Sequence, residues 1–171
     1  MNYKIKDLCE ITSSRRIFAK EYTKEGIPFF RSQEIIELST KGKTTPKIFI
    51  SNKRYNEILS NGLNVPSKGD ILMSAIGANR GYPWNVSFDK FYFKDGNVIW
   101  LRNFTKQCNS KYLTYALSTS KNINMLQTAS EHSAQGAITL DLIKNIEIYL
   151  PSINIQQHIV NTISFLLLKF L

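Results

Sequence analysis

The sequence lacks the short motifs that mark common enzyme classes. It contains no GxGxxG pattern, no P-loop, no HExxH motif and no Gly-x-Ser-x-Gly elbow. It has no Pro-Pro pair, which an adenine methyltransferase motif would need, and no carboxylate cluster typical of a metal-dependent nuclease. His132 beside Ser133 is an isolated pair in a polar loop, which is weak evidence for a base and a nucleophile. We therefore expect no catalytic activity in this chain.

Cysteine and histidine are also scarce. The two cysteines, Cys9 and Cys108, and the two histidines, His132 and His158, are scattered along the sequence. This spacing favours neither a metal site nor a disulfide, so we expect reduced thiols and no metal. The chain opens without a secretory signal, and its apolar last residues fall short of the ~18 that a membrane span needs. We expect a cytoplasmic protein without a membrane partner.

Acidic residues are outnumbered by basic ones. The 171 residues include 22 Lys and Arg against 13 Asp and Glu, a formal net charge of +9. This excess favours a polyanionic partner, with nucleic acid first and an anionic membrane second, although a solvated basic surface is the simpler alternative. The length predicts one domain, and a hydrophobic content of 43% argues against disorder.

The centre of the sequence predicts a buried strand that ends in a glycine-rich loop. Gly69-Asp70 is typical of a turn, and Ile71 to Ile76 is an apolar run apart from Ser74, short enough to be one buried strand. Gly77 and Gly81 then bracket Ala78-Asn79-Arg80, whose tip offers an amide and a guanidinium. Taken alone, this pattern favours a strand followed by an ordinary glycine-rich surface turn.

The remaining patterns predict strands first and helices last. In the first half we expect a helical turn over Tyr3–Ile11, a strand at Phe29–Phe30, a strand over Lys47–Ile50, a Ser51-capped helix through Leu59, and an Asp95-Gly96 hairpin joining Val86–Lys94 to Asn97–Arg102. In the second half we expect a helix over Asn109–Ala129 broken near Ser120–Asn122, a helix over Leu140–Asn145, a strand from Ile146 to Leu150, and a final helix capped by Ser152.

Three blocks, in this order, carry a resemblance to a known family. They are Gly26-Ile27-Pro28-Phe29-Phe30-Arg31; then Ile50-Ser51, Val65 and Gly69-Asp70-Ile71-Leu72 with Ser74 and Gly77; then Gln135-Gly136-Ala137-Ile138, Leu142-Ile143-Lys144-Asn145-Ile146, Leu150-Pro151 and Gln156-Gln157-His158-Ile159-Val160. From about Ile5 to Val160, the chain resembles a target-recognition domain of the specificity (S) subunit of type I restriction–modification systems.

The resemblance implies an α+β fold with a compact, coiled β-rich target-recognition domain, followed by helices that end in the start of a long spacer helix. Residues 1–151 would be the recognition domain, and 152–171 the start of a spacer or dimerisation helix. The chain would read one half-site of a bipartite target in double-stranded DNA, with no cofactor of its own. A partner methyltransferase subunit would supply S-adenosylmethionine and methylate adenine, and a restriction subunit would cut.

One feature departs from the family. Its members usually carry two recognition domains and two charged spacer helices, whereas this sequence has one recognition domain and only Lys169 as a charge in 164–171. Three interpretations of the single recognition domain stay open: a natural half-subunit that dimerises, a truncated gene product, or an engineered fragment. The apolar stripe of the last helix packs either on its own domain or on a partner, including a second copy, through Ile159, Ile163, Leu166, Leu167 and Phe170.

Residue chemistry indicates which side chains would contact DNA. The expected phosphate contacts are Arg15, Arg16, Lys41, Lys43 and Lys47. The expected base readers are Arg31, Gln33, Asn79 and Arg80, because Arg pairs with guanine and Gln or Asn with adenine. Arg31 and Gln33 could equally pair with Glu34 or Glu37. Further candidate DNA contacts are Tyr82, Trp84, His132 and Gln135.

Two other functions stay open at this point. The chain could be a fragment that binds and regulates the methyltransferase without reading DNA, a hypothesis motivated by the apolar tail and the single domain. It could also be an RNA-binding β-domain that stacks bases on Tyr82, Trp84 and the run Phe91-Tyr92-Phe93.

Overall fold

The computed structural model describes residues 1–62, 65–133 and 136–169. Its α-helices within this range are α1 (Ser32–Lys41), α2 (Asn52–Ser60), α3 (Ser110–Leu117), α4 (Ser120–Glu131), α5 (Leu140–Lys144) and α6 (Ile153–Lys169). Its strands are β1 (Asn2–Lys4), β2 (Glu10–Thr12), β3 (Tyr22–Thr23), β4 (Ile27–Phe30), β5 (Phe49–Ile50), β6 (Ile71–Ser74), β7 (Pro83–Asn85), β8 (Tyr92–Phe93), β9 (Val98–Arg102) and β10 (Glu147–Tyr149). Two short 3-10 helices, η1 (Ile5–Asp7) and η2 (Ala19–Glu21), complete the described elements.

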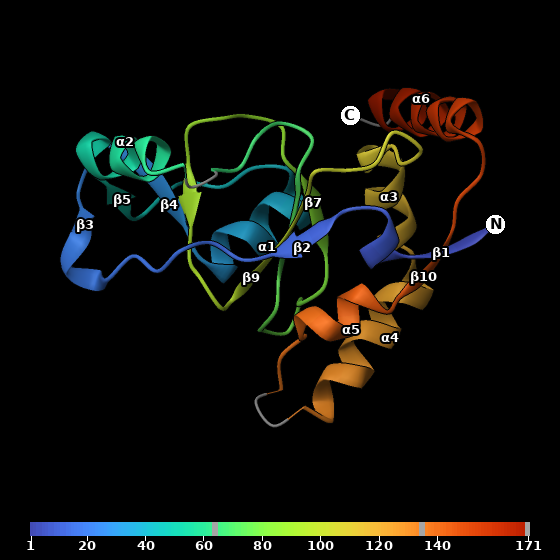
Figure 1. Ribbon diagram of the computed structural model, residues 1–171, viewed down its shortest axis with the longest axis horizontal. Helices are drawn as coiled ribbons and strands as arrows, with labels where there is room; N and C mark the ends of the chain where they lie inside the picture. The colour runs from blue at the N-terminus through green and yellow to red at the C-terminus, as the bar shows by residue number, and fades with distance from the viewer. Residues whose placement is uncertain (63–64, 134–135, 170–171) are drawn as a thin grey trace.

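The strands form a central sheet, a side sheet and a small ribbon. The central sheet has the order β2-β9-β6-β7 and is antiparallel throughout. The side sheet has the order β3-β5-β4-β8, with β4 and β8 parallel and the other pairs antiparallel. β1 and β10 pair at the other end of the molecule, near α5 (Figure 1). This mixed architecture confirms the predicted α+β class.

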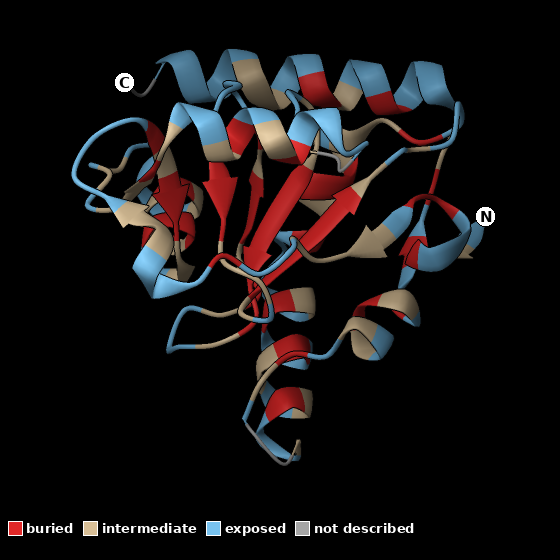
Figure 2. Cartoon of the chain, turned by 60° about the vertical axis from the view of Figure 1, so that its left-hand side comes forward, coloured by how far each residue is buried: buried red, intermediate tan, exposed pale blue. Residues whose placement is uncertain are grey.

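The central strand β6 is buried on both faces because a separate hydrophobic core covers each face. Ile71 and Met73 on β6 belong to a core that includes side chains of α3, α4 and α5, whereas Leu72 belongs to a core built with α1. A strand sends successive side chains to opposite faces, so a continuous apolar run is what a doubly covered strand needs. Strand β6 is accordingly buried along its length and β9 from Val98 to Leu101, whereas the edge strand β2 is partly exposed (Figure 2). The predicted strand in this segment is confirmed.

A third core lies under α2. Ser51 caps this helix as predicted, since its Oγ accepts a hydrogen bond from the Arg54 backbone N–H at 3.1 Å. Tyr55 and Ile58 on the buried face of α2 belong to a core that also contains Phe29 of β4. The side sheet and α2 thus form a lobe beside the central sheet (Figure 1).

The structure differs from the local predictions in three places. The helical turn predicted over residues 3–11 is present only as η1, and β1 and β2 flank it because both short strands pair with partners far along the chain. Helix α1 was missed, since its buried apolar positions are only Ile35 and Leu38. Asp95-Gly96 does form a turn, but it joins two sheets: β8 pairs with β4, and β9 pairs with β6 and β2.

The helical second half follows the prediction more closely. The break between α3 and α4 falls at Ser118 and Thr119, and Thr139 caps α5 through its Oγ1. The predicted final helix is present as α6. The division into a recognition domain and a spacer helix stays a prediction.

Buried Gln156 anchors α6. Its Oε1 accepts from the Asn109 backbone N–H at 2.8 Å, and its Nε2 donates to the carbonyl oxygens of Gln107 and Pro151, each at 2.8 Å. The side chain is 0% exposed, so all of its polar atoms are used inside the protein. These bonds fix the start of α6 to the loop that precedes α3.

Candidate nucleic-acid interface

Several loops meet at one end of the two larger sheets. Because β4 and β8 are parallel, their carboxyl ends lie together, and the Lys94 N–H donates to the Phe30 carbonyl at 2.8 Å. The Ala75 N–H, just after β6, donates to the Asn97 carbonyl at 2.9 Å. Residues 13–18, 31–33, 76–81 and 94–97 therefore surround one region, which we call the sheet-end surface.

The segment 13–16 is fixed to this end by hydrogen bonds. Ser13 Oγ donates to the Val98 carbonyl at 3.0 Å, and Ser14 Oγ donates to the Phe93 carbonyl at 2.7 Å. The Arg15 N–H donates to the Tyr92 hydroxyl at 3.0 Å. Burial is the main reason that the pKa of Tyr92 is raised, so its hydroxyl stays neutral.

The side chains of Arg15 and Arg16 are exposed on this fixed segment. The Arg16 Nε lies 3.0 Å from Asp95 Oδ2, an ion pair that ties the segment to the turn 94–97. An exposed pair of this kind contributes little stability and exchanges readily for a phosphate. The two predicted phosphate contacts therefore share one surface.

Helix α1 begins at the same surface. Arg31 forms an ion pair with Glu34, with Nη2 3.1 Å from Oε1, and the Arg31 N–H donates to Glu34 Oε2 at 2.9 Å. Gln33 Nε2 donates to Glu37 Oε1 at 2.9 Å. Of the two possible roles, the structure shows the pairing of Arg31 and Gln33 with neighbouring carboxylates. The two side chains would have to exchange these partners to reach a base.

The lysine-rich loop folds back along α1. Thr44 Oγ1 donates to Glu37 Oε2 at 2.5 Å, and the hydrogen bonds from Thr44 and Gln33 lower the pKa of Glu37. Lys41, Lys43 and Lys47 are all exposed. Because β5 runs antiparallel to β4, Lys47 returns to the end of β4 from which Arg31 leaves. Helix α1 is about 15 Å long, and Lys41 lies at its far end.

Arg80 is a scaffold residue in this structure, although the sequence pointed to a base reader. Its Nε donates to Ser130 Oγ at 2.5 Å, its Nη1 to the Gly77 carbonyl at 3.2 Å and its Nη2 to the Gln127 carbonyl at 3.1 Å. Its side chain is 15% exposed. The guanidinium therefore holds the loop 77–81 against α4. Asn79, at the tip of that loop, is exposed and stays a candidate base reader.

Of the remaining candidate DNA contacts, Trp84 needs correction. Trp84 is 6% exposed and packs among Phe30, Phe88 and Phe91, so its ring has no surface to offer a base. Tyr82 is half-buried, and His132 is exposed at the end of α4 beside the loop held by Arg80. Gln135 lies outside the described residues. The run Phe91-Tyr92-Phe93 is at most 1% exposed, which removes the stacking platform of the RNA-binding hypothesis.

Sequence reasoning overlooked Phe18, Lys20 and Lys94 at or beside the sheet-end surface. Phe18 is 55% exposed, and Arg16, Phe18 and Lys94 border a hollow of about 420 Å³. No sequence pattern separates Phe18 from the many buried phenylalanines. Only the packing of η2 leaves its ring outside.

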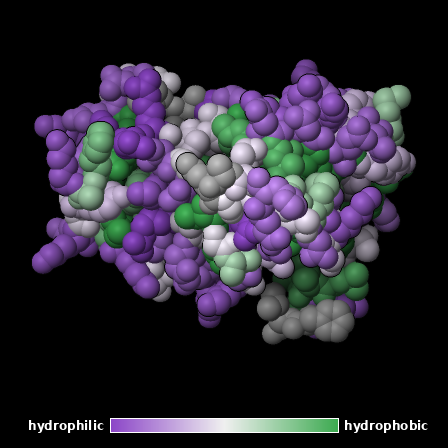
Figure 3. Space-filling view, turned by 90° about the horizontal axis from the view of Figure 1, so that it is seen from below, coloured by the Kyte–Doolittle hydropathy of each residue, from purple (hydrophilic) through white to green (hydrophobic). Residues whose placement is uncertain are grey.

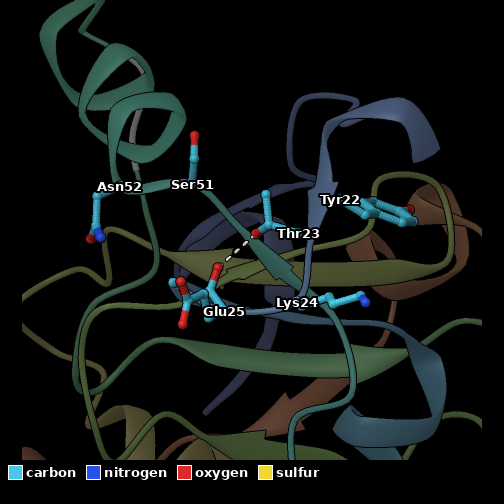
Figure 4. Close-up of a pocket in the computed structure, with 7 residues that line it drawn as sticks. Tyr22, Thr23, Lys24, Glu25, Ser51 and Asn52 are labelled. Atoms are coloured by element: carbon cyan, nitrogen blue, oxygen red, sulfur yellow. Dashed lines mark hydrogen bonds between the residues drawn. The ribbon is translucent and has the colours of Figure 1, made fainter.

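A larger hollow of about 960 Å³ lies between the β3–β4 turn and the start of α2 (Figure 4). Thr23 Oγ1 donates to the Glu25 carbonyl at 2.7 Å and shapes that turn (Figure 4). The lining side chains include one cation, Lys24, and one carboxylate, Glu25. Their charges cancel, so this hollow has little attraction for a polyanion.

Asp70 supports the fold at the opposite end of β6. Its Oδ2 accepts from Trp100 Nε1 at 2.8 Å and from the Ser67 N–H at 3.0 Å, and burial raises its pKa.

Within the described ranges, no group of three His, Cys, Asp or Glu side chains is arranged to hold a metal ion. No helix among those residues combines the length and apolarity required to cross a membrane. The face in Figure 3 is largely hydrophilic.

Comparison with known proteins decides the family. A family profile described as the type I restriction modification DNA specificity domain matches residues 1–169. This chain belongs to that family. The resemblance seen in the three sequence blocks is thereby confirmed.

The specificity domain is also similar to individual relatives. A curated protein of Haemophilus influenzae, named as a type I restriction enzyme specificity subunit, is 28% identical over 158 residues, covering 91% of this chain and 37% of its own length. A solved chain from a study of assembly and conformational transition in a type I R-M system matches with TM-score 0.68 and 22% identity, covering 99% of this chain and 38% of that one. The HsdS subunit from Thermoanaerobacter tengcongensis matches with TM-score 0.66 and 20% identity, covering 99% and 37% respectively.

These structural matches show that the specificity domain has the fold of S subunits. The chain spans less than two fifths of the length of each of these relatives. The family blocks lie mostly in the scaffold: Gly69 to Leu72 form a turn and a buried strand, and Gln156 anchors α6. The sheet-end loops lie largely outside these blocks.

Proposed function

We propose that this specificity domain reads one half-site of a bipartite target in double-stranded DNA for a type I restriction–modification system. The observation that carries the proposal is the sheet-end surface. It gathers Arg15, Arg16 and Lys94 on loops fixed by hydrogen bonds to rigid strands, in a chain with a net charge of +9. Cations on a fixed frame position a duplex through its phosphates, and neighbouring polar tips such as Asn79 can then reach base edges.

In this proposal the chain itself performs no chemistry. A partner methyltransferase subunit binds S-adenosylmethionine and methylates adenine, and a restriction subunit cleaves. The specificity domain contributes the choice of site, because it holds the methyltransferase where its sheet-end surface finds matching bases.

Helix α6 supplies the surface for a partner helix or a second copy. Ile159 and Ile163 are half-buried and line a groove of about 370 Å³ that also includes side chains of α3 and β10. Leu166 and Leu167 are 48% and 54% exposed, so the last turns of α6 present uncovered apolar area. Phe170, also expected at this contact, lies outside the described residues. A two-fold dimer through α6 would read a symmetric, interrupted site.

A selection experiment tests the proposed function. The chain is purified with its methyltransferase subunit and incubated with a pool of randomised DNA duplexes, and bound duplexes are sequenced. We expect enrichment of one short motif. In a double variant, Arg15→Ala with Lys47→Ala, binding of all duplexes falls while the motif is retained, because phosphate contacts carry affinity without sequence information. A stable complex that enriches no sequence contradicts the proposal and favours the non-reading fragment.

A further inference from the structure

Phe18 is an exposed aromatic residue that the core does not explain. Its side chain is 55% exposed, on the segment that connects the sheet-end surface to η2. Within the described part of the chain, no other aromatic ring contacts it, and its ring contact is with Lys20, whose Nζ lies 6.0 Å from the ring centroid. Water exposure of an isolated phenylalanine ring is unfavourable relative to its burial.

Phe88 provides the contrast. It is also partly exposed, at 37%, but its ring packs against Phe30, Trp84 and Phe91 with centroid distances of 5.2 to 6.1 Å. Phe88 is therefore the outer edge of an aromatic core. Phe18 has no such role, so its exposure calls for a different explanation.

The backbone of Phe18 is held rigidly. Its N–H donates to Glu21 Oε2 at 2.7 Å, and the Glu21 N–H donates back to the Phe18 carbonyl at 2.9 Å. Glu21 Oε1 in turn lies 2.7 Å from Arg54 Nε on α2. Ile17, the preceding residue, is 3% exposed. The Glu21–Arg54 ion pair and the buried side chain of Ile17 therefore hold the segment in which the Phe18 ring points outward.

The surroundings of Phe18 are cationic. Its side chain borders the hollow of about 420 Å³ together with Arg16, Lys94 and the turn Asp95-Gly96. Arg15 and Lys20 flank it in sequence and are both exposed. An apolar ring among cations matches a ligand that has negative charge at its periphery and flat apolar surface within, and duplex DNA combines phosphates with bases in this way.

We propose that Phe18 is a specificity-determining residue that makes an apolar contact with one base of the target, while Arg15, Arg16 and Lys94 engage the adjacent phosphates. The proposal rests on the proposed function and deepens it, because it assigns a base contact that the polar candidates do not include. The apolar feature contacted is either the methyl group of thymine in the major groove or the face of a base at an opened step.

The experiment compares three forms of the chain, each purified with its methyltransferase subunit: wild type, Phe18→Ala and Leu59→Ala. Leu59 is 46% exposed on α2 of the same lobe and outside the sheet-end surface, so its variant controls for loss of an exposed apolar side chain. Melting temperatures verify that all three fold. Selection from randomised duplexes then gives the preference at every position of the motif.

We expect Phe18→Ala to lose discrimination at one base pair by about five- to tenfold, within the range for one base contact, and to keep it elsewhere. Leu59→Ala should keep the wild-type preference at every position. If the lost position prefers thymine, uracil in its place lowers wild-type binding to the Phe18→Ala level when the methyl group is contacted. An unchanged wild-type affinity for uracil assigns the contact to the base face.

Two results overturn the proposal. One is a Phe18→Ala complex with wild-type discrimination at every position. The other is a uniform loss of affinity for all duplexes with an unchanged motif, which would make Phe18 a support for binding rather than a base contact. If the wild-type complex itself enriches no motif, the proposed function fails, and the base contact fails with it.

Discussion

Replacing Gln156 tests how firmly α6 is attached to the rest of the domain. The buried amide makes three hydrogen bonds of 2.8 Å to backbone groups of Gln107, Asn109 and Pro151. At about 1 kcal/mol net for each neutral bond, they contribute about 3 kcal/mol together. Gln156→Met keeps the length of the side chain and removes all three bonds. We therefore expect it to lower the free energy of unfolding by about 2–4 kcal/mol.

The neighbouring Gln157 provides a matched control. It is exposed, and its Oε1 accepts one bond from Asn109 Nδ2 at 2.9 Å. Gln157→Ala should change the free energy of unfolding by no more than ~0.5 kcal/mol, as surface substitutions usually do. Urea denaturation followed by circular dichroism measures both variants. The reasoning is refuted if Gln156→Met destabilises the protein no more than Gln157→Ala does.

Three further predictions concern the scaffold and the proposed interface. Arg80→Lys should lower the melting temperature nearly as much as Arg80→Ala, because an ammonium cannot reproduce the three directed bonds of the guanidinium; full stability in the lysine variant would contradict that role. Lys47→Ala should reduce the slope of log affinity against log salt by about one, whereas Lys144→Ala, on α5, should leave it unchanged; equal slopes for both variants would remove Lys47 from the interface. Burial raises the pKa of Cys9 to about 12 and of Cys108 to about 11, so as the pH rises above the ordinary thiol pKa of 9.0 the unfolded chain releases these protons before the folded protein does. The free energy of unfolding should therefore fall as the pH rises above 9.0. Chemical denaturation at a series of pH values should show a smaller decrease in this free energy for Cys9→Ala than for the wild type.

The sequence predicted a helix or strand correctly where one short segment contains both its hydrophobic pattern and the residues at which it begins or ends. Ser51 caps α2, and the apolar residues Ile71 to Met73 after Asp70 form most of the doubly buried strand β6. A cap needs only residues within one turn of the helix, and a buried strand needs only its own composition. Such elements could be located without knowing what packs on them.

Partners distant in the sequence explain what could not be predicted. The Asp95-Gly96 turn reverses the chain as expected, but β8 pairs with β4, some sixty positions earlier, rather than with the strand that follows the turn. A turn signal carries no information about strand pairing. Helix α1 shows few apolar positions because only one narrow side of it faces the core.

The candidate interface was predictable in charge but not in detail. Arg15 and Arg16, expected as phosphate contacts from their charge, lie on an exposed segment that hydrogen bonds of Ser13 and Ser14 fix in place. Trp84 and Arg80 look equally available in the sequence, yet one fills a core and the other clamps a loop. Whether a side chain is free to meet a ligand depends on tertiary packing, which residue type alone does not encode.

The most direct test of DNA reading is methylation in cells. The chain is co-expressed with the methyltransferase subunit of its system in a host that lacks adenine methylation, and methylated adenines are mapped across the genome. The account predicts methylation at one motif, symmetric and interrupted if two copies pair through α6, and none when this chain is omitted. A stable complex of the two proteins that leaves the genome unmethylated would contradict it.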